Sequence, residues 1–205
     1  MKKLHFLCAV FMLLMMTACR SSGSPAWSDD FSDPASGWKV ESDATAEVAY
    51  HEGVMRILVK APNSLAWASA GRKFADFHLT VEASQVSGPD NNEYGVLVRM
   101  RDPQHFYRFS ISGDGYFLVS KHDGEKWEAL SGDDWAPSGA IHTGKATNVL
   151  EISCRGTEMT FSVNGVQVAQ VKDQSYLQGD IALYAGTFFE PDVEVYFDNL
   201  SVGAP

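Results

Sequence analysis

Cysteine is scarce in this chain, and its scarcity excludes a disulfide-stapled fold. The 205 residues include three cysteines. Two of them, Cys8 and Cys19, lie in the N-terminal segment discussed below, which leaves Cys154 without a partner for an internal disulfide. Cys154 continues the apolar alternation of Leu150 and Ile152 at an inward phase, and no neighbouring residue offers an activating base. We therefore expect a buried structural thiol and not a nucleophile.

Basic residues are also few. Lys2 and Lys3 are two of the 16 basic residues, which leaves 14 in the rest of the chain against 26 acidic residues. A nucleic-acid-binding protein would carry a basic patch or stripe, and none is visible, so we expect no nucleic-acid partner. The acidity fits a domain that does not adhere to anionic membranes.

Motifs of the common catalytic and metal-binding classes are missing. The sequence contains no Gly-x-Ser-x-Gly, no His-Glu-x-x-His and no metal-spaced cluster of cysteine and histidine. The histidines beyond the N-terminal segment are scattered one per segment, which favours surface positions. They are His51, His78, His105, His122 and His142. We predict no catalytic residue, no metal and no cofactor.

Only one long apolar run is present, from Leu4 to Ala18. At 15 residues it is too short for a membrane-spanning helix, which needs about 20. The basic start Met1-Lys2-Lys3 before it is typical of a signal peptide. The end of the run, Leu13-Leu14-Met15-Met16-Thr17-Ala18-Cys19, closely resembles the lipobox of bacterial lipoproteins.

That resemblance implies a lipid on Cys19 as the new N-terminus and a location in the cell envelope. Arg20 after the cysteine would permit delivery to an outer membrane, if the host has one. We expect residues 1–18 to be the signal peptide, residues 19–28 to be the lipidated cysteine with a polar tether, and residues 29–205 to form one folded domain. An ordinary signal peptide with an incidental cysteine is the alternative.

The rest of the chain reads as strand after strand. Alternation of apolar and polar residues is clear in the segments 94–100, 106–112, 159–163 and 181–185. Tight-turn pairs join such runs: Asp114-Gly115, Asp123-Gly124 and Asn164-Gly165. No amphipathic helix is visible after Ala18. About a dozen short strands are too many for one flat sheet, so the pattern predicts an all-β fold of two packed antiparallel sheets.

A series of short motifs resembles the concanavalin A-like lectin/glucanase superfamily, and most closely its bacterial laminin G-like and 3-keto-disaccharide hydrolase-type domains. In chain order they are Asp30-Phe31, Gly37-Trp38, Phe74-Ala-Asp76-Phe, Tyr94-Gly95-Val96 with Arg99, Phe106–Ile111, Asp114-Gly115-Tyr116, Asn164-Gly165 and Phe197–Val202. The resemblance covers nearly all of the mature chain. It implies a two-sheet jelly-roll sandwich whose concave face often binds carbohydrate, but a shared fold does not settle activity.

The catalytic signature of the glucanase members is absent. Those enzymes carry Glu-x-Asp-x-x-Glu or a near variant on one strand, and the nearest pair here is Glu194 and Asp198. Four strand residues span about 13 Å, more than the roughly 5–9.5 Å that separates paired catalytic carboxylates. The resemblance also suggests a structural calcium ion, with Asp29, Asp30 and Asp198 as its candidate ligands. The sequence has no compact calcium-loop pattern, so we assign no metal.

We predict a ligand-binding site of four residues. Arg99 and Arg108 fall at outward phases of two neighbouring strands, and Tyr184 is outward in its own strand, so all three are expected on one concave surface. Trp135, in the loop 132–139, is the fourth candidate. Guanidinium groups would suit an acidic glycan. Alternatively, the two arginines pair with Glu93 or other acids for purely structural reasons.

Three functions remain open. The first is a non-catalytic, lectin-like module of the cell envelope that binds glycan or polysaccharide. The second is a glycoside or 3-keto-disaccharide-type hydrolase. The third is an accessory lipoprotein that contacts another envelope protein. The missing carboxylate motif favours the first and third over the second.

Overall fold

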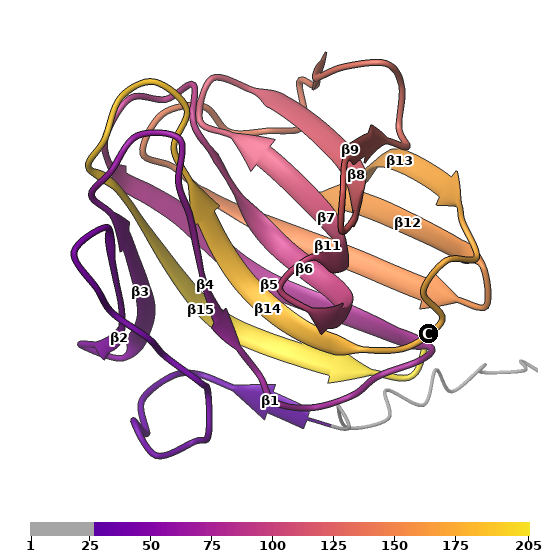
Figure 1. Cartoon of the computed structure of the whole chain (residues 1–205), viewed down its shortest axis with the longest axis horizontal. Helices are drawn as coiled ribbons and strands as arrows, with labels where there is room; N and C mark the ends of the chain where they lie inside the picture. The colour runs from indigo at the N-terminus through magenta and orange to yellow at the C-terminus, as the bar shows by residue number, and fades with distance from the viewer. Residues whose placement is uncertain (1–26) are drawn as a thin grey trace, which may run out of the picture.

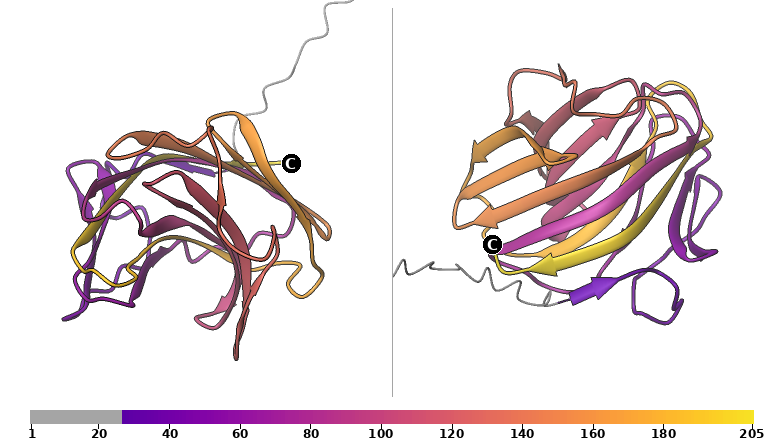
Figure 2. Two further views of the ribbon diagram at one scale, coloured as in Figure 1. Left: turned by 90° about the horizontal axis from the view of Figure 1, so that it is seen from above. Right: turned by 180° about the vertical axis from the view of Figure 1, so that it is seen from behind.

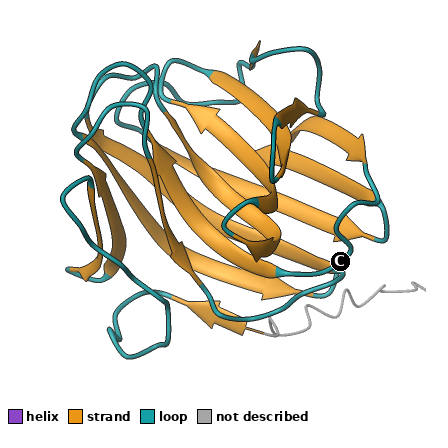
Figure 3. Ribbon diagram, viewed as in Figure 1, coloured by secondary structure: helices purple, strands orange, loops and turns teal. Residues whose placement is uncertain are grey.

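The computed structural model describes residues 27–205, and every regular element in that range is a β-strand (Figure 3). The predicted signal peptide, residues 1–18, and the lipidation site Cys19 lie outside the described residues. Among the described residues, no helix is long and apolar enough to cross a bilayer. The first strand, β1, begins at Trp27.

The first sheet has eight antiparallel strands (Figure 1). Its order is β13 (Val166–Lys172), β12 (Glu158–Val163), β11 (Thr147–Arg155), β5 (Phe77–Ser87), β15 (Val193–Gly203), β3 (Val54–Val59) and β2 (Ala46–His51), with β1 (Trp27–Asp29) added beside the end of β15.

The second sheet has seven antiparallel strands. Its order is β10 (Ala136–Pro137), β8 (Tyr116–Asp123), β7 (His105–Ser112), β6 (Glu93–Asp102), β14 (Asp180–Gly186) and β4 (Leu65–Ser69), with β9 (Trp127–Ala129) added beside β8. The two sheets lie face to face in separate layers (Figure 2). The prediction of an all-β, two-sheet antiparallel sandwich is therefore confirmed.

The core lies between the sheets and follows the alternation of the sequence. Tyr94, Val96 and Val98 of β6 are fully buried against the first sheet. Phe109 of β7 meets Phe161 of β12 edge-on across the gap, with ring centroids 5.5 Å apart. Aromatic and β-branched side chains fill the space between two sheets efficiently, and their burial supplies most of the driving force for this packing.

The hairpin predictions hold as well. Asp114-Gly115 joins β7 to β8, Asp123-Gly124 joins β8 to β9, and Asn164-Gly165 joins β12 to β13. Asn164 and Gly165 both have positive φ, at 51° and 79°. A two-residue turn that matches the twist of its strands needs such angles, and asparagine and glycine adopt them at least cost.

Cys154 is fully buried on β11, as expected for a structural thiol. Burial in an apolar layer disfavours the thiolate and raises the pKa of its thiol to about 12.

The chain enters and leaves the fold at the same place. Trp27 of β1 pairs with Val202 of β15, near the C-terminal end. The Trp27 ring packs on Trp38, with centroids 5.4 Å apart, and stacks on Phe74 at 6.0 Å. These aromatic contacts hold a strand of only three residues in position.

Candidate functional site

The face of the second sheet that points away from the core forms the floor of the candidate site, and we call it the concave face. Antiparallel partners share a face, so the register gives rows of neighbouring side chains. One row runs Trp67, Tyr184, Gly95, Ser110 and Leu118 across β4, β14, β6, β7 and β8. Within residues 27–205 no other strand packs across this face, yet several of its polar side chains are buried. Neighbouring side chains must therefore crowd over one another, as they do where a sheet curves inward (Figure 2).

Gly95 leaves the middle of this row without a side chain. A Cβ atom there would lie 2.0 Å from the carbonyl oxygen of Phe109, so no other residue fits. Because Gly95 has no side chain, Tyr184 of β14 can reach across β6, and its hydroxyl hydrogen-bonds with the hydroxyl of Ser110 on β7. The glycine of the Tyr94-Gly95-Val96 motif is therefore needed for the contact between Tyr184 and Ser110 on the concave face.

A buried ion pair lies beside this tyrosine. The Arg108 guanidinium donates to the Glu93 carboxylate at 2.7 Å and to the Ser120 hydroxyl at 3.2 Å. The hydroxyl of Tyr184 donates to the other oxygen of Glu93 at 3.3 Å. Desolvation raises the pKa of Glu93, although Arg108 opposes the shift. Desolvation also raises the pKa of Tyr184 well above its usual value, so its phenol stays protonated.

The structure therefore brings Arg108 and Tyr184 together as predicted, and it confirms the alternative that Arg108 pairs with Glu93. One more side chain completes the group. The exposed ring of Trp127, on β9, lies 4.0 Å from the guanidinium carbon of Arg108 and covers it from solvent.

Arg99 does not belong to this group, and the prediction that it shares an outward surface with Arg108 is wrong. Its φ of 50° marks an irregularity in β6, where the register with β7 shifts between Val98 and Asp102. The side chain is fully buried. It donates to the carbonyl oxygen of Ala75 at 3.0 Å and to that of Tyr176 at 3.2 Å. Arg99 thus ties two loop segments to the sheet and is out of reach of a ligand on the concave face.

Trp135 also lies away from Arg108 and Tyr184. It precedes β10, beyond the row just described, and its half-buried ring meets Phe188 at 6.2 Å and 87°. It lines a separate cavity that is discussed below.

A pocket of about 400 Å³ opens at the β4 side of the concave face. Trp67 and Leu65 of β4 form its apolar wall, together with Met100 near the end of β6 and Pro103 in the turn that follows β6. Its polar lining comes mainly from the segment 39–45 and from one residue of β4. These residues are Lys39, Glu41, Ser42, Asp43, Thr45 and Ser69. We call this space the strap pocket, because residues 39–45 run along β4 like a strap.

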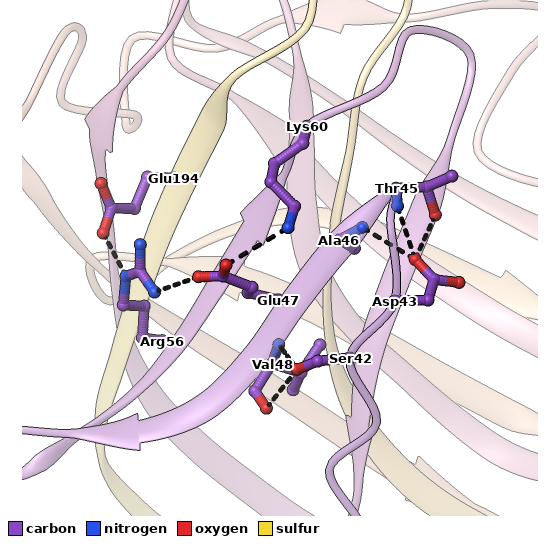
Figure 4. Close-up of polar contacts among 9 residues, drawn as sticks. All are labelled: Ser42, Asp43, Thr45, Ala46, Glu47, Val48, Arg56, Lys60 and Glu194. Atoms are coloured by element: carbon purple, nitrogen blue, oxygen red, sulfur yellow. Dashed lines mark hydrogen bonds and ion pairs between the residues drawn. The ribbon is translucent and has the colours of Figure 1, made fainter.

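The strap is fixed at both ends. Lys39 and Ser69 exchange backbone hydrogen bonds of 2.8 and 3.1 Å. At the other end, one carboxylate oxygen of Asp43 accepts from the backbone N–H groups of Thr45 and Ala46 and from the Thr45 hydroxyl (Figure 4). These hydrogen bonds hold the pKa of Asp43 below its usual value.

The strand after the strap is also anchored. The Ser42 hydroxyl accepts from the backbone N–H of Val48 at 3.0 Å. On the outer face, Glu47 pairs with Arg56 at 3.0 Å and with Lys60 at 3.2 Å, and Arg56 also pairs with Glu194 (Figure 4). The pocket wall is thereby held in shape before any ligand arrives. Among the described residues, neither Lys39 nor Glu41 makes an ion pair, so both remain available to a ligand.

The acidic residues that the family resemblance suggested for calcium have other partners. The Asp29 carboxylate accepts from the Phe31 backbone and from the Trp38 indole, both at 2.9 Å. Asp30 accepts from the backbone and hydroxyl groups of Ser32. In residues 27–205 no three His, Cys, Asp or Glu side chains are grouped so that they could hold a metal ion.

Sequence reasoning missed the strap pocket. Trp67 was visible as one of five tryptophans, but nothing in its strand indicated which face it occupies. The polar residues 39–45 have no motif of their own and meet Trp67 only through the fold.

Comparison with known proteins places these features in a family. The family described as 3-keto-alpha-glucoside-1,2-lyase-like domain matches residues 27–203. No curated protein matches the chain by sequence.

Solved structures share the fold at low identity. One is the carbohydrate-binding module CBM66 from Bacillus subtilis, with a TM-score of 0.66, 12% identity, and coverage of 82% of this chain and 96% of that one. Another is the β-glucanase of Bacillus licheniformis, with a TM-score of 0.65, 7% identity, and coverage of 90% and 100%. A third, from Bacillus subtilis, is a protein of unknown function with a galectin-like fold, with a TM-score of 0.67, 10% identity, and coverage of 89% and 96%. Binding modules and enzymes thus share this architecture.

Proposed function

Because the chain belongs to the family of 3-keto-alpha-glucoside-1,2-lyase-like domains, we propose that it is a carbohydrate-binding domain that takes a neutral sugar in the strap pocket. The observation that carries this proposal is the lining of the pocket, where an aromatic ring stands opposite a set of polar side chains. The indole of Trp67 offers a surface for the apolar face of a pyranose. Glu41, Asp43 and Ser69 offer hydrogen-bond partners for its hydroxyl groups.

The charge distribution supports a neutral ligand over an acidic one. Of the two arginines that would have suited an acidic glycan, Arg99 is buried and Arg108 is neutralised by Glu93. The pocket itself carries two carboxylates, Glu41 and Asp43, against the single cation Lys39. A carboxylated or sulfated sugar would meet net repulsion there.

The proposed setting is the cell envelope. The segment ending in Thr17-Ala18-Cys19 supports export and a lipid on Cys19. Anchoring at the N-terminus would display the domain next to the membrane, with Trp27 as its point of attachment to the tether.

A glycan array tests the binding proposal with full-length protein and three variants. We expect wild type to bind a set of neutral glycans, and Trp67→Ala to lower affinity for them about tenfold or more through the loss of stacking area. Glu41→Gln should weaken binding, whereas the matched control Glu52→Gln, on the exposed β2–β3 turn, should not. Unchanged binding by both folded pocket variants would show that the sugar binds elsewhere, and a preference for sulfated glycans would contradict the charge argument.

The family match itself favours a second function, elimination from a 3-keto-glucoside. In such a 1,2-elimination a base removes the proton at C2, a C1=C2 double bond forms, and the glycosidic oxygen leaves with the bond electrons. Glu41 is the carboxylate in the pocket that is free to act as that base. Release of aglycone from a 3-keto-glucoside, abolished in Glu41→Gln, would establish this activity. Binding without release would leave the domain a binding module.

A further inference from the structure

A second cavity lies at the other side of the concave face, where β6, β7 and β8 meet their loops. It measures about 220 Å³. Three aromatic residues form its walls, Tyr116, Trp135 and Phe188, and three polar residues complete the lining, Asn91, Ser112 and Asp114. We call it the aromatic corner, because the rings of Trp135 and Phe188 stand at 87° to each other.

The corner is fixed in shape. Phe188 is held by a hydrogen bond from its backbone N–H to the buried Asn92 side chain, at 2.8 Å. The loop that carries Trp135 is tied to β8, since Ala136 pairs with Phe117. Ser112 donates to Asp114 and accepts from the backbone N–H of Tyr116 at 3.2 Å. Two perpendicular rings with a carboxylate and an amide at the rim suit one sugar ring, which would stack on one aromatic face and bond through its hydroxyls.

The corner and the strap pocket are connected by one row of the sheet. Leu65 lines the strap pocket, and Ser112 lines the corner. The register places them in the same row, with Gly186 and Glu93 between them. Leu65 and Ser112 are therefore three strand spacings apart, which is about 14 Å. In the middle of the row Gly186 has no side chain, and the Leu65 and Glu93 side chains lie over it, while the Glu93 carboxylate accepts a hydrogen bond from Arg108.

We infer that the aromatic corner is a second sugar subsite, and that one extended glycan chain crosses the sheet from the strap pocket to the corner. This inference rests on the proposed carbohydrate-binding function and specifies its ligand as an oligosaccharide or polysaccharide of several rings. A disaccharide fills one subsite and cannot reach the other. Binding should therefore strengthen with chain length until both subsites are filled.

The test is a length series of neutral glycans, from disaccharide to octasaccharide, arrayed against full-length protein. Trp135→Ala and Phe188→Ala should lower affinity for the long chains about tenfold, to the level of the short ones, and leave the short ones unchanged. Phe189→Ala is the matched control: this neighbour is 85% exposed and does not line the corner, so its variant should behave as wild type. Melting temperatures identify variants that have lost the fold.

The outcomes separate the two proposals. Equal affinity of wild type, Trp135→Ala and Phe188→Ala at every length overturns the corner subsite and leaves the strap pocket standing. Loss of binding in the corner variants but not in Trp67→Ala would support the corner and overturn the strap pocket. Wild type that binds no glycan of any length overturns both.

Discussion

Removing the cation of the buried ion pair should destabilise the domain strongly. The side chains of Arg108 and Glu93 are 10% and 5% exposed. Arg108→Met leaves the Glu93 carboxylate desolvated, with the Tyr184 hydroxyl as its remaining partner. The loss of one member of a buried pair costs about 3–5 kcal/mol, because the other charge stays buried without compensation. For a domain of this size we expect a fall in melting temperature of about 10 °C.

The same variant should show a characteristic pH dependence. Without Arg108, only the hydrogen bond from Tyr184 opposes the desolvation of Glu93, so the pKa of its carboxyl in the folded state rises further above the unfolded value. The folded state then binds a proton more readily than the unfolded state. The loss of stability relative to wild type is therefore largest above the pKa of Glu93 in the folded state. It decreases as the pH falls toward the pKa of a glutamate in the unfolded state, about 4.3. Urea unfolding at about pH 8 and pH 5 measures the difference.

Two further variants sharpen this test. Arg108→Met combined with Glu93→Gln should be more stable than Arg108→Met alone, since an amide carries no charge to bury. Arg56→Met is the matched control, because Arg56 sits in a partly exposed cluster and its loss should cost only about 1 kcal/mol. A cost below about 1 kcal/mol for Arg108→Met, equal at both pH values, would refute the account of a buried and essential pair.

Three other predictions follow from the sequence and the fold. Gly95→Ala should cost about 3 kcal/mol or more in urea unfolding, because its Cβ meets the backbone oxygen of Phe109, whereas Gly139→Ala, with open space around it, should be close to neutral. Cys154 should react with a thiol reagent only on unfolding, and reductant should leave the melting temperature unchanged; rapid labelling of native protein at pH 9 would contradict its burial. Cys19→Ser should release the protein from membranes, and a wild type found wholly in the soluble fraction without an acyl mass would rule out the anchor.

The strand pattern was the most predictable part of the molecule. Period-two alternation identified the inward residues of β7, β12 and β14, and those of β6 as far as Val98, whereas Met100 packs on the concave face and not in the core as the alternation predicts. Asn-Gly and Asp-Gly pairs identified three hairpins. Both signals are local. The alternation depends on the position of each residue within its own strand, and the turn pairs depend on the φ angles of two adjacent residues. In regular strands, therefore, the apolar residues of the alternating pattern are the residues that lie in the core.

Arg99 shows where that reasoning fails. Alternation assigns it to the face opposite Val98, but a positive φ at Arg99 breaks the alternation and turns the guanidinium toward Ala75 and Tyr176. An irregularity of one residue redirects a side chain without altering the apolar pattern before it. The sequence of residues 94–100 contains no signal that predicts this irregularity at Arg99.

The strap pocket was out of reach for a different reason. Trp67 and Glu41 are brought together by an isolated backbone bridge between Lys39 and Ser69. Such a contact depends on how an edge strand is covered, and a single sequence carries no record of it. The aromatic corner was partly visible, since Trp135 stood out in its loop, but its partner Phe188 comes from the far side of the sheet.

The pairing of β1 with the end of β15 makes the domain a convenient unit for assembly into other proteins. Because Trp27 lies opposite Val202, a host chain can enter and leave through neighbouring positions, so the domain can be spliced into a surface loop as well as fused at a terminus. The aromatic corner borders the loop that precedes β15, and this loop lies at the opposite end of that strand from Val202. A host attached through Trp27 and Val202 would therefore leave the aromatic corner open to solvent.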